Sequence, residues 1–156
     1  MEYIKGKEEP ETDAKKEAVL PAVSFTRCPV GITAGLLGKK WTMLILRDIG
    51  FRNIQRFNRL LESIPGITPR VLSLRLKELE KEGYIECIER KSSMLVRWAL
   101  TEKGEDALPI LMSFVAFGSK WYADQVFDDK RPRTLQDVFK SPRAREIIER
   151  YTRVLN

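Results

Sequence analysis

The feature that most restricts the fold of this chain is the Pro65–Gly66 pair, which separates two short segments of helical periodicity. Before this pair, apolar side chains repeat at the spacing of one helix face, at Phe57, Leu60, Leu61 and Ile64. After it, Thr68 and Pro69 predict the start of a second helix, as an N-cap residue and a first-turn proline. The leucines of this second helix follow at Leu72, Leu76 and Leu79. Two amphipathic helices joined by a tight turn are typical of a helix-turn-helix unit.

The periodicity changes after Gly83. Residues Tyr84–Arg90 contain strand-forming side chains without clean alternation, and Met94–Leu100 alternates more regularly. The intervening Lys91–Ser92–Ser93 predicts a turn. We therefore expect a β-hairpin with a basic tip directly after the two helices, an order that predicts a winged helix-turn-helix.

Further helical segments surround this unit. A short helix is expected to begin at Pro29, a second to cover residues 40–49, and a long one to follow Thr101. Pro109 should break or kink the long helix, and a last helix should begin at Pro142. The fold class we expect is mainly α with a small β-hairpin wing (α+β), flanked by N- and C-terminal dimerisation helices.

Charge and composition divide the chain into three parts. Residues 1–26 form a polar arm, residues 27–127 the winged unit with its dimerisation helix, and residues 128–156 a helical extension. The net charge is +6, and its positive excess lies mainly before residue 105, which suggests a polyanionic partner. Residues 1–17 lack the apolar core of a secretory signal, and no apolar stretch is long enough to span a bilayer. We therefore expect a cytoplasmic protein without a membrane partner.

The residue types that are missing exclude several classes of function. The chain has no His, which removes Ser-His-Asp and Cys-His catalysis and mixed Cys/His zinc sites. Its two Cys are too few for a structural zinc site with four ligands. The carboxylates form no paired motif, and no Gly-rich phosphate loop is present. We therefore expect neither an enzyme nor a metal or cofactor site.

The outward face of the helix over residues 69–82 is the candidate functional site. Arginine can donate two hydrogen bonds to guanine, and cations on a hairpin can lie along a phosphate backbone or a minor groove. We expect contacts with double-stranded DNA from Thr68, Pro69, Arg70, Ser73, Leu74, Arg75 and Lys77, from Arg90, Lys91, Ser92 and Arg97 of the hairpin, and from Arg56. The competing interpretation is an ordinary solvated surface, which is favoured by the acids Glu78, Glu80 and Glu82.

Short motifs follow one another in a recognisable order along residues 28–121. They are Cys28–Pro29–Val30, Gly38–Lys39–Lys40–Trp41–Thr42, Ile45–Leu46–Arg47, Arg56–Phe57, Ile64–Pro65–Gly66–Ile67–Thr68–Pro69–Arg70–Val71–Leu72–Ser73, Glu82–Gly83, Leu100–Thr101–Glu102–Lys103–Gly104 and Leu108–Pro109. With these motifs the sequence resembles the HxlR-type transcriptional regulators. The resemblance implies a homodimeric winged-helix DNA-binding protein whose terminal helices form the dimer. It also implies that Pro69–Lys77 contacts DNA bases, in successive major grooves, and that Arg90–Arg97 forms the wing.

The sequence departs from the family pattern in three places. The connection from Gly50 to Arg56 is longer than the family's usual Gly-Pro link and holds Phe51 and Ile54. The hairpin lacks the prolines that family wings often carry. Leu74 stands where the family often has a polar residue, and it either contacts a thymine methyl group or packs within the protein. A different operator sequence is therefore expected.

Cys28 is the candidate redox residue. Arg27 beside it and the helix N-terminus after it both favour the thiolate, the reactive form of the side chain. The resemblance implies that some members sense electrophiles or oxidants through a Cys at this position. The alternative is a small apolar residue packed near the dimer seam. Cys87 is expected to belong to the core.

The long helix after Thr101 carries more large apolar side chains than a small winged unit can bury. We expect it to pack across a two-fold axis against the tract Leu20–Leu37 of a second copy. The interface predicted on this basis contains Leu36, Leu111, Phe114, Val115, Gly118, Trp121 and Tyr122. The last helix should pack on the dimer or cover DNA with Arg143, Arg145 and Arg150.

Two functions remain open at this point. The first is a sequence-specific transcriptional regulator that binds a pseudo-palindromic operator as a homodimer, with a redox response through Cys28. The second is a winged-helix protein-interaction module of the transcription machinery, with only nonspecific affinity for DNA. The sequence indicates no particular effector.

Overall fold

The computed structural model describes residues 18–20, 22–90 and 96–155 of the 156-residue chain. Most of the predicted polar arm, and Lys91 and Ser92 of the predicted wing, lie outside these described residues. The elements follow one another as α1 (Pro29–Leu37), α2 (Thr42–Gly50), α3 (Phe57–Ser63), α4 (Pro69–Lys81), β1 (Ile85–Arg90), β2 (Val96–Leu100), α5 (Glu102–Trp121), α6 (Ala123–Val126), α7 (Leu135–Val138) and α8 (Pro142–Leu155).

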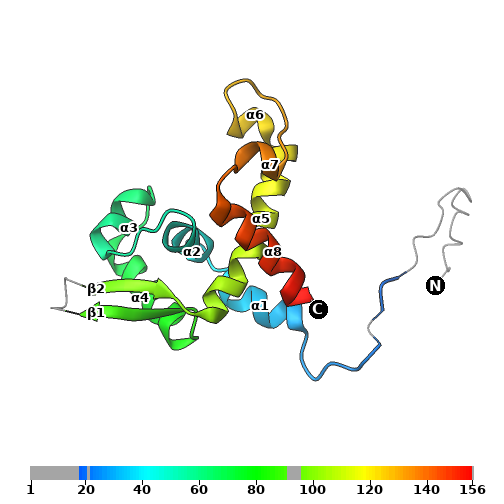
Figure 1. Cartoon of the computed structure of the whole chain (residues 1–156). Coiled ribbons are helices and arrows are strands. Elements are labelled where there is room, and N and C mark those ends of the chain that lie inside the picture. The colour runs from blue at the N-terminus through cyan, green and yellow to red at the C-terminus, as the bar shows by residue number, and fades with distance from the viewer. Residues whose placement is uncertain (1–17, 21, 91–95, 156) are drawn as a thin grey trace, which may run out of the picture.

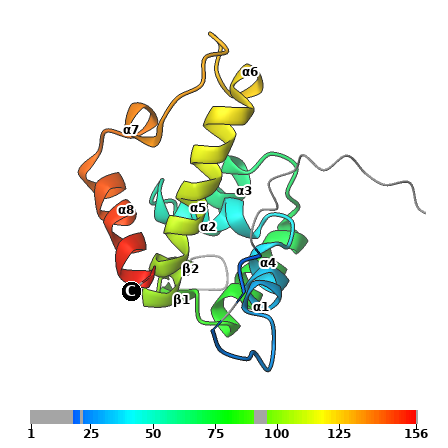
Figure 2. The same ribbon diagram turned by 90° about the vertical axis from the view of Figure 1, so that its right-hand side faces the viewer.

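The helix-turn-helix and the hairpin form one end of the molecule. Figure 1 shows α2, α3, α4 and the two strands gathered there, with α5 leading away from the hairpin. In Figure 2, α5 is the long central helix, with α8 along one side and α6 at its far end. The two strands pair antiparallel. The predicted mainly α fold with a β-hairpin wing is therefore confirmed.

The turn between α3 and α4 forms as the Pro65–Gly66 pair predicts. Gly66 has a φ of 86°, a left-handed conformation that glycine adopts without strain. The N–H of Ile67 donates to the carbonyl of Ile64 at 3.3 Å and closes the turn. Thr68 then caps α4, because its side-chain oxygen accepts a hydrogen bond from the N–H three residues later. This turn fixes the direction in which α4 leaves α3.

The hairpin explains why its first strand lacks clean alternation. Ile88 lies between Cys87 and Glu89 and opposes no residue of β2, so it forms a bulge. Ile88 is exposed, whereas Ile85 on the same strand is buried. Cys87 is half-buried and packs against the core, which corrects the prediction that it belongs to the core itself.

The long connection between α2 and α3 is held against the wing. Arg56 forms an isolated bridge with Arg97 of β2, and the N–H of Trp98 donates to the carbonyl of Gln55 at 2.9 Å. At its other end, the N–H of Ile54 donates to a carbonyl of α2 at 2.9 Å. The extra residues of this connection therefore act as a short third partner of the hairpin.

The core is built around α2. Ile45 and Leu46 are fully buried, and their helix contacts α1, α3, β2 and α5. The predicted leucine row of α4 is buried in the same core, at Leu72, Leu76 and Leu79. Burial of each such side chain stabilises the folded protein by about 1.5–3 kcal/mol.

α2 begins at Thr42 rather than at residue 40, because Trp41 takes a left-handed conformation with a φ of 80°.

α5 continues through Pro109, so the break that was one of the two predicted effects of this proline does not occur. A proline removes one backbone hydrogen bond and crowds the preceding turn. Here Pro109 is buried together with neighbours on the same helix, Ala107, Leu108, Leu111 and Met112, which belong to the central core. Burial of these turns offsets the cost of the proline.

α8 packs along α5 of the same chain. Ile147 is buried in the shared core. Arg143 pairs with Glu105, and Arg150 pairs with Asp106, each at 2.6 Å. Two of the three arginines predicted for dimer or DNA contacts are therefore used within the protomer. The extension joins the winged unit instead of standing apart from it.

Gly104→Ala is expected to destabilise the protein by about 1–3 kcal/mol, the usual cost of overpacking. A Cβ at this position in α5 would overlap the carbonyl of Tyr84, a backbone atom that cannot rotate away. Gly35→Ala is the matched control, because a Cβ there meets nothing within 4 Å. Urea denaturation measures both free energies of unfolding. Equal values for Gly104→Ala and the unaltered protein would contradict the close approach of α5 to the turn after α4.

Candidate nucleic-acid interface

α4 presents one row of side chains to solvent. Arg70, Leu74 and Lys77 are exposed, Ser73 is half-buried in the same row, and Thr68–Pro69 are exposed at its start. Leu74 is 50% exposed, so it does not pack into the protomer. Among the described residues, neither Arg70 nor Lys77 has an ion-pair partner. This row is therefore free to contact another molecule.

Arg75 faces a different direction. Its Nε donates to the carbonyl of Lys40 at 3.2 Å, and its guanidinium pairs with Glu78 at 2.8 Å. Only 18% of its side chain is exposed. The contact of Arg75 with DNA stays a prediction, and within the protomer its guanidinium joins α4 to the connection between α1 and α2.

Glu78 is balanced by cations of the same protomer. Its two carboxylate oxygens lie 2.9 Å from Lys39 Nζ and 2.8 Å from the guanidinium of Arg75. The hydrogen bond from Lys39 is the main cause that holds the pKa of Glu78 below its ordinary value. Partial burial acts in the opposite sense, and Arg75 adds to the lowering. This acid therefore adds little negative charge to the exposed row of α4.

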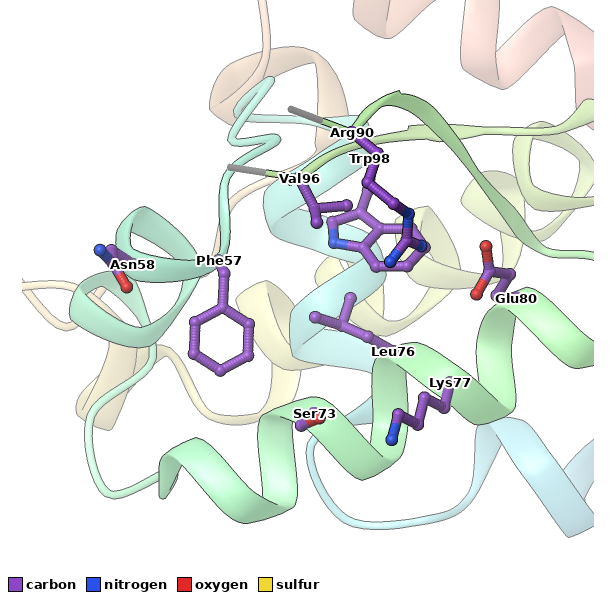
Figure 3. A pocket seen from close by; sticks show the side chains of 9 residues that line it. All are labelled: Phe57, Asn58, Ser73, Leu76, Lys77, Glu80, Arg90, Val96 and Trp98. Atoms are coloured by element: carbon purple, nitrogen blue, oxygen red, sulfur yellow. The ribbon is translucent and has the colours of Figure 1, made fainter. Parts of the chain in front are cut away.

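A hollow of about 410 Å³ lies between α4 and the hairpin (Figure 3). Ser73 and Lys77 line it from α4, and Arg90 lines it from β1. Arg90 is exposed and, in the part of the chain that the structure describes, has no ion-pair partner. Glu80 is the acid among the lining residues. The exposed row of α4 and the start of the wing thus share one concave, basic surface.

Arg56 and Arg97 lie at the base of the wing. Arg97 donates to Gln55 Oε1 at 2.5 and 3.2 Å, and its guanidinium lies 3.5 Å from the carboxylate of Glu89. Arg56 lies 3.8 Å from the same carboxylate. Both arginines hold the α2–α3 connection against the hairpin, and both remain partly exposed.

The position of α3 depends on Asp48, whose side chain is fully buried. Arg47 and Arg52 donate to one carboxylate oxygen at 2.7 and 3.3 Å, and Ser63 at the end of α3 donates to the other. A buried carboxylate is tolerated only when it is paired and hydrogen-bonded. We did not predict this role of Asp48 from the sequence. The signal that could have identified it is an acidic residue on the buried face of a helix.

The second half of α5 exposes an aromatic surface. Phe114, Trp121 and Tyr122 of the predicted interface are 66%, 62% and 51% exposed. Phe117, which the prediction omits, is 57% exposed, and its ring lies 6.5 Å from that of Trp121 and 6.0 Å from that of Tyr122. Its spacing of three residues from Phe114 and four from Trp121 is the signal that could have identified it. We call Phe114, Phe117, Trp121 and Tyr122 the aromatic surface.

Leu111 does not belong to this surface. It is 4% exposed and packs in the protomer's core, so its placement in a dimer interface is corrected. Val115, Gly118 and Leu36 are half-buried. α5 carries apolar side chains on more than one face, and the sequence pattern does not separate the inward face from the outward one.

Cys28 is exposed immediately before α1. It occupies the N-cap position, but its side chain makes no capping hydrogen bond. Arg27 beside it is exposed as well. The thiol is therefore accessible to reagents in solution.

Comparison with known proteins places this arrangement in a class. Residues 36–126, more than half of the chain, match the model of the HxlR-like helix-turn-helix family. The chain therefore belongs to this family, whose members are DNA-binding transcriptional regulators rather than enzymes, as the sequence predicts. No helix among the described residues has the length and apolar character needed to cross a bilayer.

Individual relatives agree with this assignment. The HTH-type transcriptional regulator sll1512 of Synechocystis is 34% identical over 95 residues, which cover 60% of this chain and 70% of that protein. The HTH-type regulator YdeP of Bacillus subtilis is 32% identical over 114 residues, covering 72% and 88% of the two chains. A MarR-family regulator from Porphyromonas gingivalis matches in structure with a TM-score of 0.53 and 31% identity, covering 63% of this chain and 96% of that one.

Lys39→Ala is expected to raise the pKa of Glu78 toward its ordinary value, because it removes the main cause of the lowering. An NMR titration of the Glu78 carboxyl carbon measures this change. A pKa that is lower in the folded than in the unfolded protein stabilises the fold above the ordinary pKa, and this stabilisation is lost as the pH falls through the lowered value.

The control for this titration is Lys40→Ala, since the ammonium of Lys40 lies over the ring of Trp41 and not against Glu78. It should leave the pKa of Glu78 unchanged. The assigned pairing would be wrong if Lys39→Ala had no larger effect than this control.

Proposed function

We propose that this protein is a sequence-specific transcriptional regulator that binds a pseudo-palindromic operator as a homodimer. One observation carries the proposal. Arg70, Lys77 and Arg90 have no ion-pair partner among the described residues, and they lie on one exposed surface of α4 and the hairpin. Other cations nearby are already paired with acids of the same protomer. They are Lys39, Arg47, Arg52, Arg56, Arg75 and Arg97. Cations left unpaired on a helix and an adjacent hairpin suit the phosphates and base edges of duplex DNA.

α4 is the recognition helix in this proposal. Its N-terminal turns enter the major groove, where Arg70 donates two hydrogen bonds to a guanine. Ser73 contacts a base or a phosphate, and the exposed Leu74 contacts a thymine methyl group. Thr68 and Pro69 bring the positive end of the helix dipole close to a phosphate. Lys77 then contacts the backbone at the edge of the groove.

The hairpin contributes the second set of contacts. Arg90, together with Lys91 and Ser92 beyond it, follows the phosphate backbone or the minor groove next to α4. Arg56 and Arg97 lie behind these residues at the base of the wing, where their remaining exposure allows phosphate contacts. These contacts add affinity without adding direct sequence information.

A second copy of the chain covers the aromatic surface in this proposal. Large exposed aromatic side chains gathered on one helix mark an interaction site, because burying them releases ordered water. α1 exposes Val30 and Ile32 as well, at 75% and 52%. Pairing these surfaces about a two-fold axis would present two copies of α4 to one face of a palindromic site.

The alternative function is a protein-interaction module with only nonspecific affinity for DNA, because the winged-helix fold serves both roles. The two candidate functions give α4 different roles. A regulator depends on single side chains for base preference, whereas an interaction module depends only on total charge. A substitution in the first turn of α4 therefore separates them.

Arg70→Ala is expected to reduce the affinity for a selected operator by about 1–3 kcal/mol and to relax the base preference at one position per half-site. Arg131→Ala is the matched control, an exposed arginine between α6 and α7 without an ion-pair partner among the described residues. Selection of bound fragments from random DNA, followed by titration at fixed salt, measures both. Equal losses for both variants, or no enriched sequence, would favour the interaction module.

Phe117→Glu combined with Trp121→Glu is expected to convert the dimer into a monomer, because two carboxylates would be buried without partners. Light scattering at micromolar concentration measures the mass. Ile88→Glu is the control, an exposed apolar residue on the hairpin that should leave the mass unchanged. A monomeric mass for the unaltered protein would refute the dimer outright.

Oxidation of Cys28 is expected to change the affinity for the operator, since its thiol is exposed at the start of α1. Operator binding before and after treatment with diamide measures the response, and non-reducing gels detect a disulfide between subunits. Cys28→Ser should abolish the response, and Cys87→Ser should retain it. An oxidant response that persists in Cys28→Ser contradicts a sensor role.

A further inference from the structure

Trp98 carries a buried indole N–H that has no hydrogen-bond acceptor among the described residues. The residue lies on β2 and is 7% exposed. Buried indole N–H groups usually have a partner, because an unpaired donor away from water costs free energy. Trp98 Nε1 is thus an unsatisfied hydrogen-bond donor within the protomer.

Trp98 also lines the hollow between α4 and the hairpin. Figure 3 shows its ring above Leu76 and overlapped in this view by the side chain of Arg90, with the indole nitrogen on the edge nearer Phe57. Phe57, Leu76 and Val96 supply further apolar lining. The volume of about 410 Å³ falls within the range of about 300–1,000 Å³ that is typical of small-molecule sites. The hollow is therefore large enough for a bicyclic ring.

The polar residues of the hollow indicate the charge of its ligand. Lys77 and Arg90 line it, and neither has an ion-pair partner in the described part of the chain. Ser73 and Asn58 add uncharged polar groups, and Glu80 is the single acid among the described residues that line the hollow. Two free cations beside an aromatic wall favour a planar apolar molecule with an anionic group.

We propose that this hollow binds a small heteroaromatic carboxylate. Its ring lies against Phe57, Leu76 and Trp98, and its carboxylate accepts hydrogen bonds from Lys77 and Arg90. An acceptor atom at the opposite end of the ring takes the hydrogen of Trp98 Nε1. The ligand thereby satisfies the buried donor and both cations at once.

Ligand binding at this site excludes DNA, a consequence that rests on the proposed function. Ser73, Lys77 and Arg90 line the hollow and also belong to the proposed DNA surface. The same cations cannot bind a carboxylate and a phosphate together. The ligand would therefore release the protein from its operator by direct competition.

The binding site is tested first without DNA, by NMR on the full chain labelled with ¹⁵N-tryptophan. The chain has three tryptophans, so three indole N–H signals are expected, and Trp98→Phe identifies one of them. The probe is quinoline-6-carboxylate, whose ring nitrogen and carboxylate lie at opposite ends. We expect the Trp98 signal to shift while the signals of Trp41 and Trp121 stay in place.

Matched probes and variants separate the parts of the site. 2-Naphthoate lacks the ring nitrogen, quinoline-6-carboxamide lacks the charge, and both should bind more weakly than quinoline-6-carboxylate. Lys77→Ala combined with Arg90→Ala should weaken binding by about tenfold or more, because two charge-assisted hydrogen bonds are lost. Lys81→Ala, on α4 but outside the hollow, should not weaken it. An unchanged Trp98 signal, or a shift confined to Trp121 of the aromatic surface, would overturn the proposal.

Competition with DNA is measured second, on a fragment selected by the protein itself. Saturating quinoline-6-carboxylate should lower the affinity of the unaltered protein for this fragment, and the effect should be smaller in Trp98→Phe. Unchanged DNA affinity at saturation would overturn the competition. If the protein selects no DNA sequence, the proposed function fails, while the NMR result still decides the ligand site.

Discussion

The placement of α3 and α4 depends on the buried carboxylate of Asp48. This carboxylate accepts hydrogen bonds from Arg47 on α2, from Arg52 just after α2, and from Ser63 at the end of α3. Because a buried charge must keep its partners, these bonds fix where α3 ends. The tight turn follows directly, and the capped start of α4 follows the turn. The position of α4 is thus determined by a charge that never reaches the surface.

The distribution of ion pairs carries more information than the net charge. A total of +6 is compatible with many surfaces. Several cations near α4 are paired with acids of the same protomer, including Arg75, which lies on α4 itself. Among the described residues, Arg70 and Lys77 on α4 and Arg90 at the end of β1 have no ion-pair partner. These three cations leave positive charge on the surface that α4 shares with the hairpin.

α5 has two different roles along its length. Its first half is buried with the core of the winged unit, including the proline that would otherwise interrupt it. Its second half presents the aromatic surface, where Phe117 and Trp121 are 57% and 62% exposed. One continuous helix therefore connects the winged unit with the aromatic surface.

The local signals of the sequence were sufficient for most of the fold. The Pro65–Gly66 turn, the caps at Thr68 and Thr101 and the leucine row of α4 all depend on neighbours within a few residues. Such interactions are the same in any context, so periodicity and turn chemistry predict them. The bulge at Ile88 was visible only as imperfect alternation.

Contacts between distant residues were decided by the tertiary structure alone. The sequence determined that α4 has a basic outward face, but not that Arg75 turns away to Lys40 and Glu78. It determined that α5 is apolar, but not that Leu111 faces inward while Phe117 faces outward. The physical reason is the same in both cases. Periodicity assigns a side chain to a face of its own helix, whereas its partner depends on which other elements pack against that face.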